Sequence, residues 1–270
     1  MPELPEITCR ARELNEILRG HRVTEIEVAQ PKCLDRPVEE FRAAVVDNLF
    51  LRVTHHGKWL ICELDRGALL INLGMGGELL WVRSERVPDK WRVRLAMEDT
   101  CQLVINFWWF GYVHIIESKD LSSHPMLAKL GPDALELDQS GFIDLLAGRR
   151  GRIKPFLLDQ SKIAGIGNAY IHDILFRARI HPLRPIPSLE EDEVEGLYSA
   201  MGDELRRSID KRGAFYELDL FGNRGGFTAD DLLIGYREGK PCPTCGTTVE
   251  KIKTGSTSGF ICPHCQPLER

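Results

Sequence analysis

Residues 154–170, KPFLLDQSKIAGIGNAY, decide the fold, because the tetrapeptide GIGN at 165–168 interrupts two helical patterns. Glycine disfavours a helix interior, so two glycines within four residues predict a turn between two separate helices. The stretch therefore predicts a helical hairpin of the helix-turn-helix kind. Apolar residues at helical spacing place these two helices and their neighbours at 140–148, 153–160, 168–178 and 189–209.

The first third of the chain has the pattern of a β domain that follows one helix. The helix is expected at 3–19, ended by Gly20, and short runs rich in Val, Ile, Leu and Trp follow it between Gly, Asp or Pro turns. Many short strands in succession predict a β-sandwich or barrel. The strands are expected at 23–28, 51–55, 59–64, 69–73, 79–82, 91–97 and 102–105.

The composition is typical of a globular protein without membrane spans. Hydrophobic residues make up 43% of the chain and charged residues 28%. No stretch approaches the run of about 18 uncharged apolar residues that a membrane helix needs, and the start MPELPEITCR lacks the pattern of a signal peptide. We therefore expect a cytoplasmic protein that contacts no membrane.

The charge is unevenly distributed along the chain. Residues 149–184 contain eight basic residues and two acidic ones, a local charge of +6, which leaves −11 for the rest of a chain whose net charge is −5. A basic block on an acidic body fits a protein that binds a polyanion with one face. A solvated helical face explains the charge alone equally well.

Four cysteines near the C-terminus have the spacing of a zinc site. Cys242 and Cys245 form one C-x2-C pair, and Cys262 and Cys265 form a second pair 16 residues later. Two such pairs supply four thiolates to one tetrahedral Zn²⁺, and the segment between them can fold as a β-hairpin. Because protein ligands fill all four positions, the zinc is expected to be structural, and so short a segment needs the metal to fold.

Pro2 follows the initiator Met1, and its nitrogen becomes a secondary amine once Met1 is removed. An α-amine titrates near pH 7.7–8.0, roughly, so a useful fraction is a neutral nucleophile at physiological pH. Attack on a sugar C1′ would give an iminium ion that promotes β-elimination, and Glu3 and Glu6 could move protons beside it. Alternatively, PELPE is only the entry to the first helix, with acids favouring its N-terminus. On these residues alone the second interpretation is the stronger one.

Taken together, the motifs resemble one family nearly from end to end. MPELPE, HHGKWL (55–60), NLGMGG (72–77), HPMLAKLGPD (124–133), residues 154–170 and the paired cysteines have the order and spacing of the formamidopyrimidine-DNA glycosylase / endonuclease VIII family. The resemblance implies an α+β fold with an N-terminal β-sandwich carrying the catalytic helix, a helix–two-turn–helix domain and a zinc-finger β-hairpin. It implies a β-sandwich at 1–120, a linker at 121–134, a DNA-binding domain at 135–235 and a zinc finger at 236–270.

The resemblance also implies an activity and its catalytic residues. Family members remove a damaged base and then cleave the strand by β,δ-elimination. By position, Pro2 is similar to the Schiff-base nucleophile and Glu3 to the acid that assists opening of the sugar ring. Glu6 matches an acid of the catalytic helix, and Lys58 resembles the lysine that holds the phosphate beside the lesion. The expected partner is damaged DNA, which is duplex, single-stranded or distorted, and a monomer is expected to bind it.

Four further residues resemble DNA contacts of the family. Asn168 corresponds to a phosphate-binding asparagine, and its expected place at a helix start suits an anion. Lys154 matches a basic position that faces the DNA cleft. Met75 and Phe110 resemble side chains that fill the gap left by the flipped nucleotide. Packing in the core is the alternative for Phe110.

Three positions depart from the family pattern. Trp108 replaces an arginine that reads the base opposite the lesion, Asn72 replaces a histidine, and Thr257 replaces the arginine of the zinc hairpin, for which Lys253 is a partial substitute. Tryptophan cannot read a base edge through paired donors as arginine does, but it stacks on bases. We therefore expect weak discrimination of the opposite base and a substrate other than 8-oxoguanine paired with cytosine. The loop 213–227 is in a position to influence lesion choice.

Two other functions fit part of the sequence. The same scaffold with weakened catalysis would give a protein that only binds damaged or distorted DNA, which the departures at the DNA contacts suggest. A zinc ribbon for contacts with other proteins explains only the last thirty residues or so. The intact set of Pro2, Glu3, Lys58 and Asn168 favours the enzyme.

Overall fold

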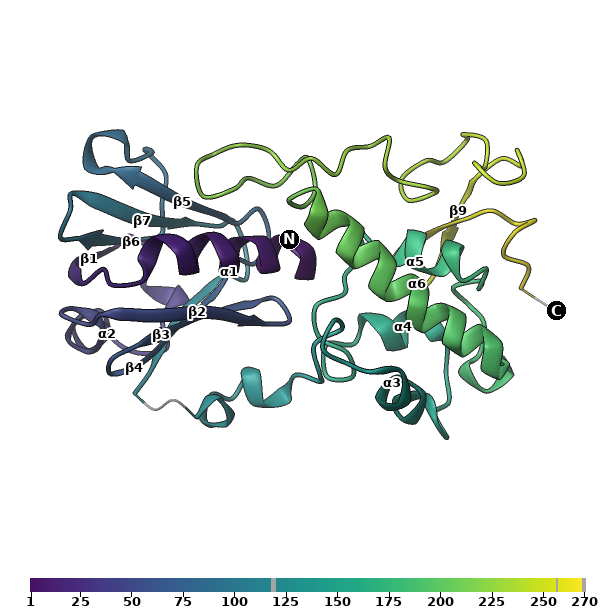
Figure 1. Cartoon of the computed structure of the whole chain (residues 1–270), viewed down its shortest axis with the longest axis horizontal. Helices are drawn as coiled ribbons and strands as arrows, with labels where there is room; N and C mark the ends of the chain where they lie inside the picture. Colours follow the sequence, from purple (N-terminus) through teal and green to yellow (C-terminus); the bar gives the residue numbers. More distant parts are fainter. Residues whose placement is uncertain (118–119, 256, 269–270) are drawn as a thin grey trace. The chain divides into compact units, whose positions relative to one another are not determined.

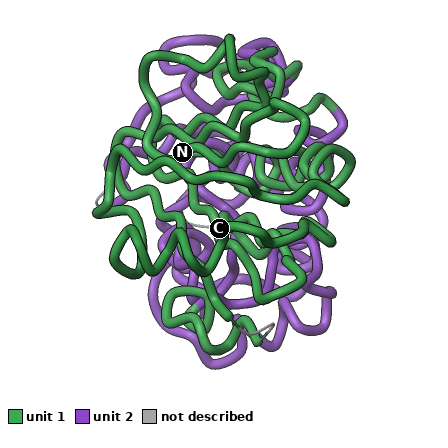
Figure 2. The backbone as a smooth tube through the Cα atoms, turned by 90° about the vertical axis from the view of Figure 1, so that its left-hand side faces the viewer, with its two compact units in different colours: residues 1–129, 211–226 green, residues 130–210, 227–270 purple. Residues whose placement is uncertain are grey.

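The computed structural model describes residues 1–117, 120–255 and 257–268. The chain divides into two compact units, which Figure 2 distinguishes by colour. Unit 1 comprises residues 1–129 and 211–226, and unit 2 comprises residues 130–210 and 227–270. The chain therefore leaves unit 1, builds most of unit 2, and returns to unit 1 for one short segment. The sequence-based division into three domains with a linker at 121–134 stays a prediction.

Unit 1 contains two four-stranded antiparallel sheets, with strand orders β1-β6-β7-β5 and β2-β3-β4-β8. Apolar residues from both sheets meet in one core, so the predicted β-sandwich is confirmed. The strands of the first sheet are β1 Val23–Val28, β6 Val93–Met97, β7 Cys101–Asn106 and β5 Glu78–Arg83. The strands of the second sheet are β2 Phe50–His56, β3 Trp59–Leu64, β4 Gly67–Asn72 and β8 Tyr112–Ile116.

Helix α1 (Leu4–Leu18) packs along this sandwich (Figure 1). Its apolar residues recur at helical spacing, and Ile7, Leu14 and Leu18 are buried in the same core as both sheets. Each such side chain contributes about 1.5–3 kcal/mol on burial. The helix therefore has a fixed position on the sandwich, and so does the chain that enters it.

Two elements of unit 1 lie outside the sequence-based expectations. Helix α2 (Val38–Val45) buries Phe41 and Val45, one helical turn apart, which is too short a pattern to recognise. Strand β8 reads YVHII and has four consecutive buried residues, so it lacks the alternation by which a strand is usually found.

Unit 2 consists of four α-helices and the hairpin near the C-terminus. All four predicted helices are present, each within a few residues of its expected bounds. They are α3 Gln139–Leu146, α4 Ile153–Leu158, α5 Ile171–Arg177 and α6 Glu191–Asp210. The hairpin pairs β9 (Glu250–Lys253) with β10 (Ser258–Ile261) in antiparallel register. The predicted α+β fold with helical hairpin and zinc-finger hairpin is thereby confirmed.

The turn between α4 and α5 depends on Gln160 and a glycine. The Gln160 amide donates to the Ile166 carbonyl (2.8 Å) and its Oε1 accepts the Gly165 N–H (3.0 Å), so one side chain bridges the turn. Gly165 has φ +108°, a conformation that other residues rarely adopt. The GIGN motif therefore ends one helix and redirects the chain into the next.

In the part of the chain that the structure describes, there is no helix of the length and apolar character required to cross a membrane.

Candidate functional site

The start of α1 is a buried cluster of acidic groups. Pro2 is buried, and Glu3 and Glu6 are 5% and 2% exposed. The Glu3 backbone N–H donates to Glu6 Oε2 (2.8 Å), and the two residues form a reciprocal capping box. Glu6 Oε1 accepts the Ala214 N–H (3.0 Å). Glu6 therefore links the entrance of the helix to the segment 211–226, and its carboxylate orients its neighbours.

A third carboxyl group, that of Glu217, lies at the amino terminus of the chain. Its Oε1 is 3.8 Å from the main-chain nitrogen of Met1, and the Glu217 side chain is 12% exposed. The sequence analysis did not single out this residue, because nothing in a glycine-rich loop predicts which side chain turns inward. The candidate centre therefore contains an amine with three carboxyl groups, one of them from residues 211–226.

The segment 211–226 is held to unit 1 by its backbone. Leu220 is fully buried, and its N–H donates to Glu13 Oε2 (3.2 Å). The Trp81 N–H of β5 donates to the Leu220 carbonyl (2.7 Å). The sequence predicts a loop at 213–227. Among the described residues the segment has no helix or strand. Its hydrogen bonds with α1 and β5 nevertheless hold the backbone in place at Leu220.

Lys58 lies in the turn between β2 and β3, half-buried. Asn72 Nδ2 donates to the Lys58 carbonyl (3.2 Å), and Asn72 Oδ1 accepts the Gly74 N–H (3.0 Å). One amide side chain thus joins the Lys58 turn to the loop after β4. An asparagine in this position uses one donor and one acceptor, which gives the departure at residue 72 a structural purpose.

The loops after β4 and β7 present aromatic side chains to solvent. The Met75 N–H donates to the Trp109 carbonyl (2.8 Å), and the Trp108 N–H donates to the Met75 carbonyl (2.9 Å). Trp108 and Phe110 are both 70% exposed and Met75 is 46% exposed. Core packing of Phe110 is therefore wrong. Trp109, 66% exposed, belongs to the same group, and the sequence FWWF already contained that signal.

The Trp108 ring rests on a glycine. A Cβ at Gly76 would lie 2.6 Å from the Trp108 ring, which is too close for any other residue without displacing the ring. Phe110 has φ +57°, an uncommon conformation for a bulky residue. Local strain of this kind costs roughly 1–3 kcal/mol and often marks functional loops. The backbone of this loop keeps the Trp108 and Phe110 rings exposed to solvent, where they can stack on planar groups.

Asn168 lies in unit 2, in the turn before α5. The helix begins at Ile171, so the expectation that Asn168 stands at a helix start is corrected by three residues. Its Nδ2 donates to the Tyr236 hydroxyl (3.4 Å). Its Oδ1 is buried and has no hydrogen-bond partner among residues 1–117, 120–255 and 257–268. Tyr236, 55% exposed, is a neighbour that the sequence did not reveal.

Lys154 is completely buried, and its expected place facing the DNA cleft stays a prediction. Its Nζ donates to Thr254 Oγ1 (2.9 Å), to Thr257 Oγ1 (3.1 Å) and to the Ser258 carbonyl. Thr257, the residue in place of the family's hairpin arginine, thus binds this lysine. Burial lowers the pKa of Lys154 to about 8. Lys253 is exposed on β9 and remains available to an external ligand.

The four predicted zinc ligands converge on one point. Their Sγ atoms all lie within 4.8 Å of one another, with the Cys242–Cys265 sulfurs 3.9 Å apart and the Cys245–Cys262 sulfurs 3.4 Å apart. Zn–S bonds of about 2.3 Å in a tetrahedron place sulfurs roughly 3.8 Å apart, so the donor set fits zinc. Four protein ligands leave no open position, which confirms one structural Zn²⁺.

The structure groups the predicted site residues into two sets. Unit 1 holds the acidic cluster at α1, the pair of Lys58 and Asn72, and the exposed group of Met75, Trp108 and Phe110. Thr8 Oγ1 lies 3.2 Å from His55 Nε2, which keeps the end of β2 beside the first turns of α1. Unit 2 holds the remaining residues, which are Lys154, Asn168, Lys253 and the four cysteines.

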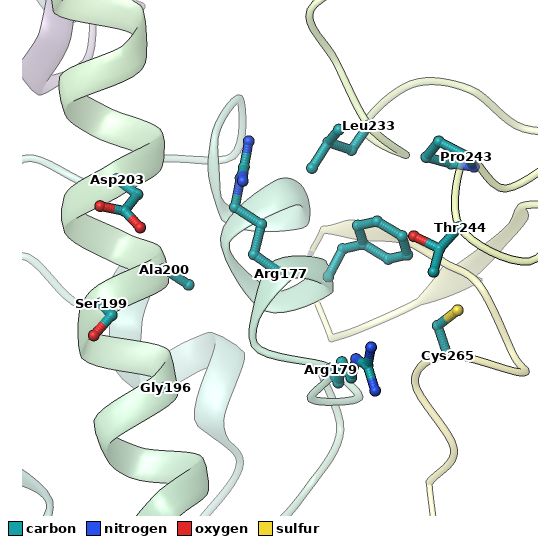
Figure 3. Close-up of a pocket in the computed structure, with 11 residues that line it drawn as sticks. Arg177, Arg179, Gly196, Ser199, Ala200, Asp203, Leu233, Pro243, Thr244 and Cys265 are labelled. Atoms are coloured by element: carbon teal, nitrogen blue, oxygen red, sulfur yellow. The ribbon is translucent and has the colours of Figure 1, made fainter.

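A separate hollow of about 490 Å³ lies in unit 2, lined by residues of α5, α6 and the zinc hairpin (Figure 3). Of the predicted residues it contains only Cys265. Arg177, which lines it, donates to Glu204 Oε2 (2.7 Å), so its charge is already compensated within the protein. This hollow therefore lacks the chemistry of the acidic cluster at α1.

Comparisons with known proteins agree along the whole chain. Residues 1–107, 130–217 and 239–268 match, in turn, the formamidopyrimidine-DNA glycosylase N-terminal domain, its H2TH domain and the zinc finger found in FPG and IleRS. The formamidopyrimidine-DNA glycosylase of Pelotomaculum thermopropionicum is 36% identical over 276 residues, covering 100% of both chains. That of Edwardsiella ictaluri is 34% identical, covering 98% of this chain and 100% of its own.

Solved structures give the same result. The complex between Lactococcus lactis Fpg and an abasic site containing DNA has a TM-score of 0.91 at 26% identity, covering 98% of this chain and 99% of that one. A complex of the same bacterium's Fpg with an oxidized pyrimidine containing DNA has a TM-score of 0.90 at 26% identity, covering 98% and 100%. The resemblance inferred from the sequence motifs is confirmed, and the chain belongs to the formamidopyrimidine-DNA glycosylase family.

Proposed function

We propose that this chain removes a damaged base from DNA by attack of the Pro2 amine on C1′, and then cleaves the strand by β,δ-elimination. Its family makes it a DNA glycosylase of base excision repair with abasic-site lyase activity. The observation that supports the assignment to Pro2 is its burial at the start of α1, where Glu3 and Glu6 are buried and Glu217 lies at the preceding Met1 nitrogen. The proposal includes a monomer that acts in the cytoplasm.

Each group of the α1 cluster has a role in this reaction. The amine supplies the electron pair for the bond to C1′ and later the iminium ion that activates the C2′ proton for elimination. Glu3 is the acid that protonates the sugar ring oxygen as the ring opens. Glu6, bound by two backbone N–H groups, positions the amine and the segment 211–226. Lys58 holds a phosphate of the damaged strand.

Damaged DNA is the proposed partner of both units. Structural relatives were solved with DNA that contains an abasic site and with DNA that contains an oxidized pyrimidine. In this chain, the exposed Met75, Trp108 and Phe110 would stack in the gap left by the flipped nucleotide. In unit 2, Asn168 Nδ2, whose present bond to the Tyr236 hydroxyl is long at 3.4 Å, would donate to a phosphate, and Lys253 offers a cation.

Borohydride trapping on abasic-site DNA tests the nucleophile. The protein is made with an N-terminal extension that a protease removes to leave Pro2 first, so that the two forms differ only at the Pro2 nitrogen. The processed form should give a covalent complex, and the extended form should give none, because its Pro2 nitrogen is an amide. Equal trapping by both forms would assign the reaction to a lysine. Binding by both forms without trapping by either would indicate a protein that only recognises damage.

Trp108 predicts little preference for the base opposite the lesion. The wild type should excise a given lesion opposite each of the four bases at rates within about tenfold, since a stacked indole reads no base edge. Trp108→Ala should weaken lesion-DNA binding by roughly 5- to 150-fold, the equivalent of about 1–3 kcal/mol per stacked base. The measurement is single-turnover excision and binding on four duplexes, with Trp91→Ala as the control for the loss of an indole ring at another position. A wild-type preference for one opposite base above a hundredfold would contradict the prediction.

A further inference from the structure

We propose that Glu217 is the proton acceptor for the N-terminal amine, so that the segment 211–226 completes the catalytic centre. This inference rests on the proposed role of Pro2. The step is removal of the proton from the attacking amine, for which the sequence motifs indicate no residue.

Hydrogen bonds of its backbone N–H and of its carbonyl fix the position of Glu217. Its backbone N–H donates to the Ala214 carbonyl (3.0 Å), and its carbonyl accepts the Gly225 N–H (3.2 Å). Ala214 in turn donates to Glu6 Oε1 (3.0 Å), which fastens the turn to the start of α1. A turn that is bound to α1 therefore places Glu217 Oε1 at 3.8 Å from the Met1 nitrogen.

The other two acids of the cluster are less suited to accept this proton. Glu6 accepts a backbone N–H on each oxygen, so both of its oxygens are already engaged in holding the start of α1 and the segment 211–226. Glu3 takes part in the capping box and is the group proposed to protonate the ring oxygen, which requires it to carry a proton at that step. Glu217 pairs with the nitrogen of Met1, the residue directly before Pro2, so its carboxyl group lies next to the position at which removal of Met1 frees the Pro2 amine.

The electrostatic setting agrees with the geometry. Burial, and then Glu6 and Glu3, raise the pKa of Glu217, while the amino terminus and Arg10 lower it, and the result is about 7. A group with that pKa is divided between carboxylate and acid at neutral pH. It can therefore accept a proton and release it again within one turnover.

The amine electron pair forms the N–C1′ bond while the bond from C1′ to the damaged base breaks. The base leaves with the electron pair of the broken bond and takes a proton from water. The attacking nitrogen is now positively charged and passes its proton to the Glu217 carboxylate. Its freed electron pair then opens the C1′–O4′ bond as Glu3 gives a proton to O4′, which leaves an iminium ion at the nitrogen.

The test is the pH dependence of borohydride trapping, measured with Glu217→Gln, Glu217→Asp and the wild type, all confirmed by mass to begin at Pro2. Glu217→Gln keeps the size of the side chain and removes the base. We expect the trapping rate at pH 7 to fall about a hundredfold, within the range of general acid–base catalysis. The inflection of the wild-type profile near pH 7 should disappear and leave only that of the amine. Glu217→Asp should retain the inflection at a reduced rate.

Asp230→Asn, which removes an exposed acid outside the segment, is the control for a change of net charge and should match the wild type. A lower rate in Glu217→Gln with the inflection unchanged would reduce Glu217 to a structural role and overturn the proposal. An unchanged rate and profile would overturn it as well. If the wild type itself fails to trap, the role of Pro2 has failed instead, so the two outcomes are distinguishable.

Discussion

Removal of the zinc ion should unfold the hairpin of β9 and β10 and abolish lesion-DNA binding. An isolated two-stranded hairpin is marginal in water, and this one has four residues in each strand. The small core beneath it includes Cys242 and Cys262 together with Phe176, Val249 and Phe260. Without the metal, this core would have to hold several thiol groups in close contact with no bond between them. Structural zinc contributes about 10–16 kcal/mol of apparent binding free energy in small zinc domains, far more than such a core supplies.

The experiment is stepwise chelation followed by hydrogen exchange. One zinc per chain should be released, and amides of residues 240–268 should lose their protection. The sandwich of unit 1 serves as an internal control, because it has its own core and should keep its protection. A hairpin that stays protected after the metal has left would show that the cysteines are dispensable for folding. Re-addition of zinc should restore protection and DNA binding together.

Replacement of Lys154 by methionine should destabilise unit 2 by about 2–4 kcal/mol. The substitution keeps an apolar stem of similar length but leaves the acceptors at Thr254, Thr257 and Ser258 without their donor. Buried acceptors without a partner cost about 1–3 kcal/mol each, partly offset by relaxation of the hairpin. Urea denaturation of the zinc-loaded protein measures the change, with exposed Lys240→Met as a control that should lie within about 0.5 kcal/mol of the wild type.

Two further measurements distinguish loss of the Lys154 hydrogen bonds from a non-specific loss of stability. Adding Thr254→Val and Thr257→Val to Lys154→Met should recover part of the loss, because both sides of the contact are then apolar. The wild type should also gain stability as the pH rises from about 8 to 10.5, since the folded state releases the Lys154 proton first. Lys154→Met should lack that gain. A triple variant less stable than the single one would contradict the hydrogen-bond account.

Much of this fold could be predicted from the sequence, because short stretches of residues carry clear patterns. The GIGN turn, the first helix and the paired cysteines each combine a period or spacing with a residue of special chemistry. The missed elements lacked such signals. Helix α2 offers two buried residues, and β8 shows no alternation.

The candidate site was harder to predict where it depends on long-range packing. Pro2, Glu3 and Glu6 could be proposed from six consecutive residues. The inward turn of Glu217 depends on hydrogen bonds with residues more than two hundred positions away, such as that of Ala214 with Glu6. The burial of Lys154 likewise depends on threonines about a hundred positions along the chain. Motif resemblance pointed to Lys154 but could not tell whether its ammonium group is exposed or enclosed, and it did not point to Glu217.

The return of residues 211–226 to unit 1 sets an order of events during synthesis. Under the proposed mechanism, Met1 must be cleaved off, yet in the folded chain Pro2 is buried and the Met1 nitrogen is paired with Glu217 of this segment. At about 5–20 residues per second, a ribosome needs roughly 10–40 seconds to pass from the first helix to this segment. The nascent chain therefore leaves its first residue open to an aminopeptidase throughout that interval. Residues 211–226 are synthesised only after this interval. Removal of Met1 can therefore come before unit 1 is complete.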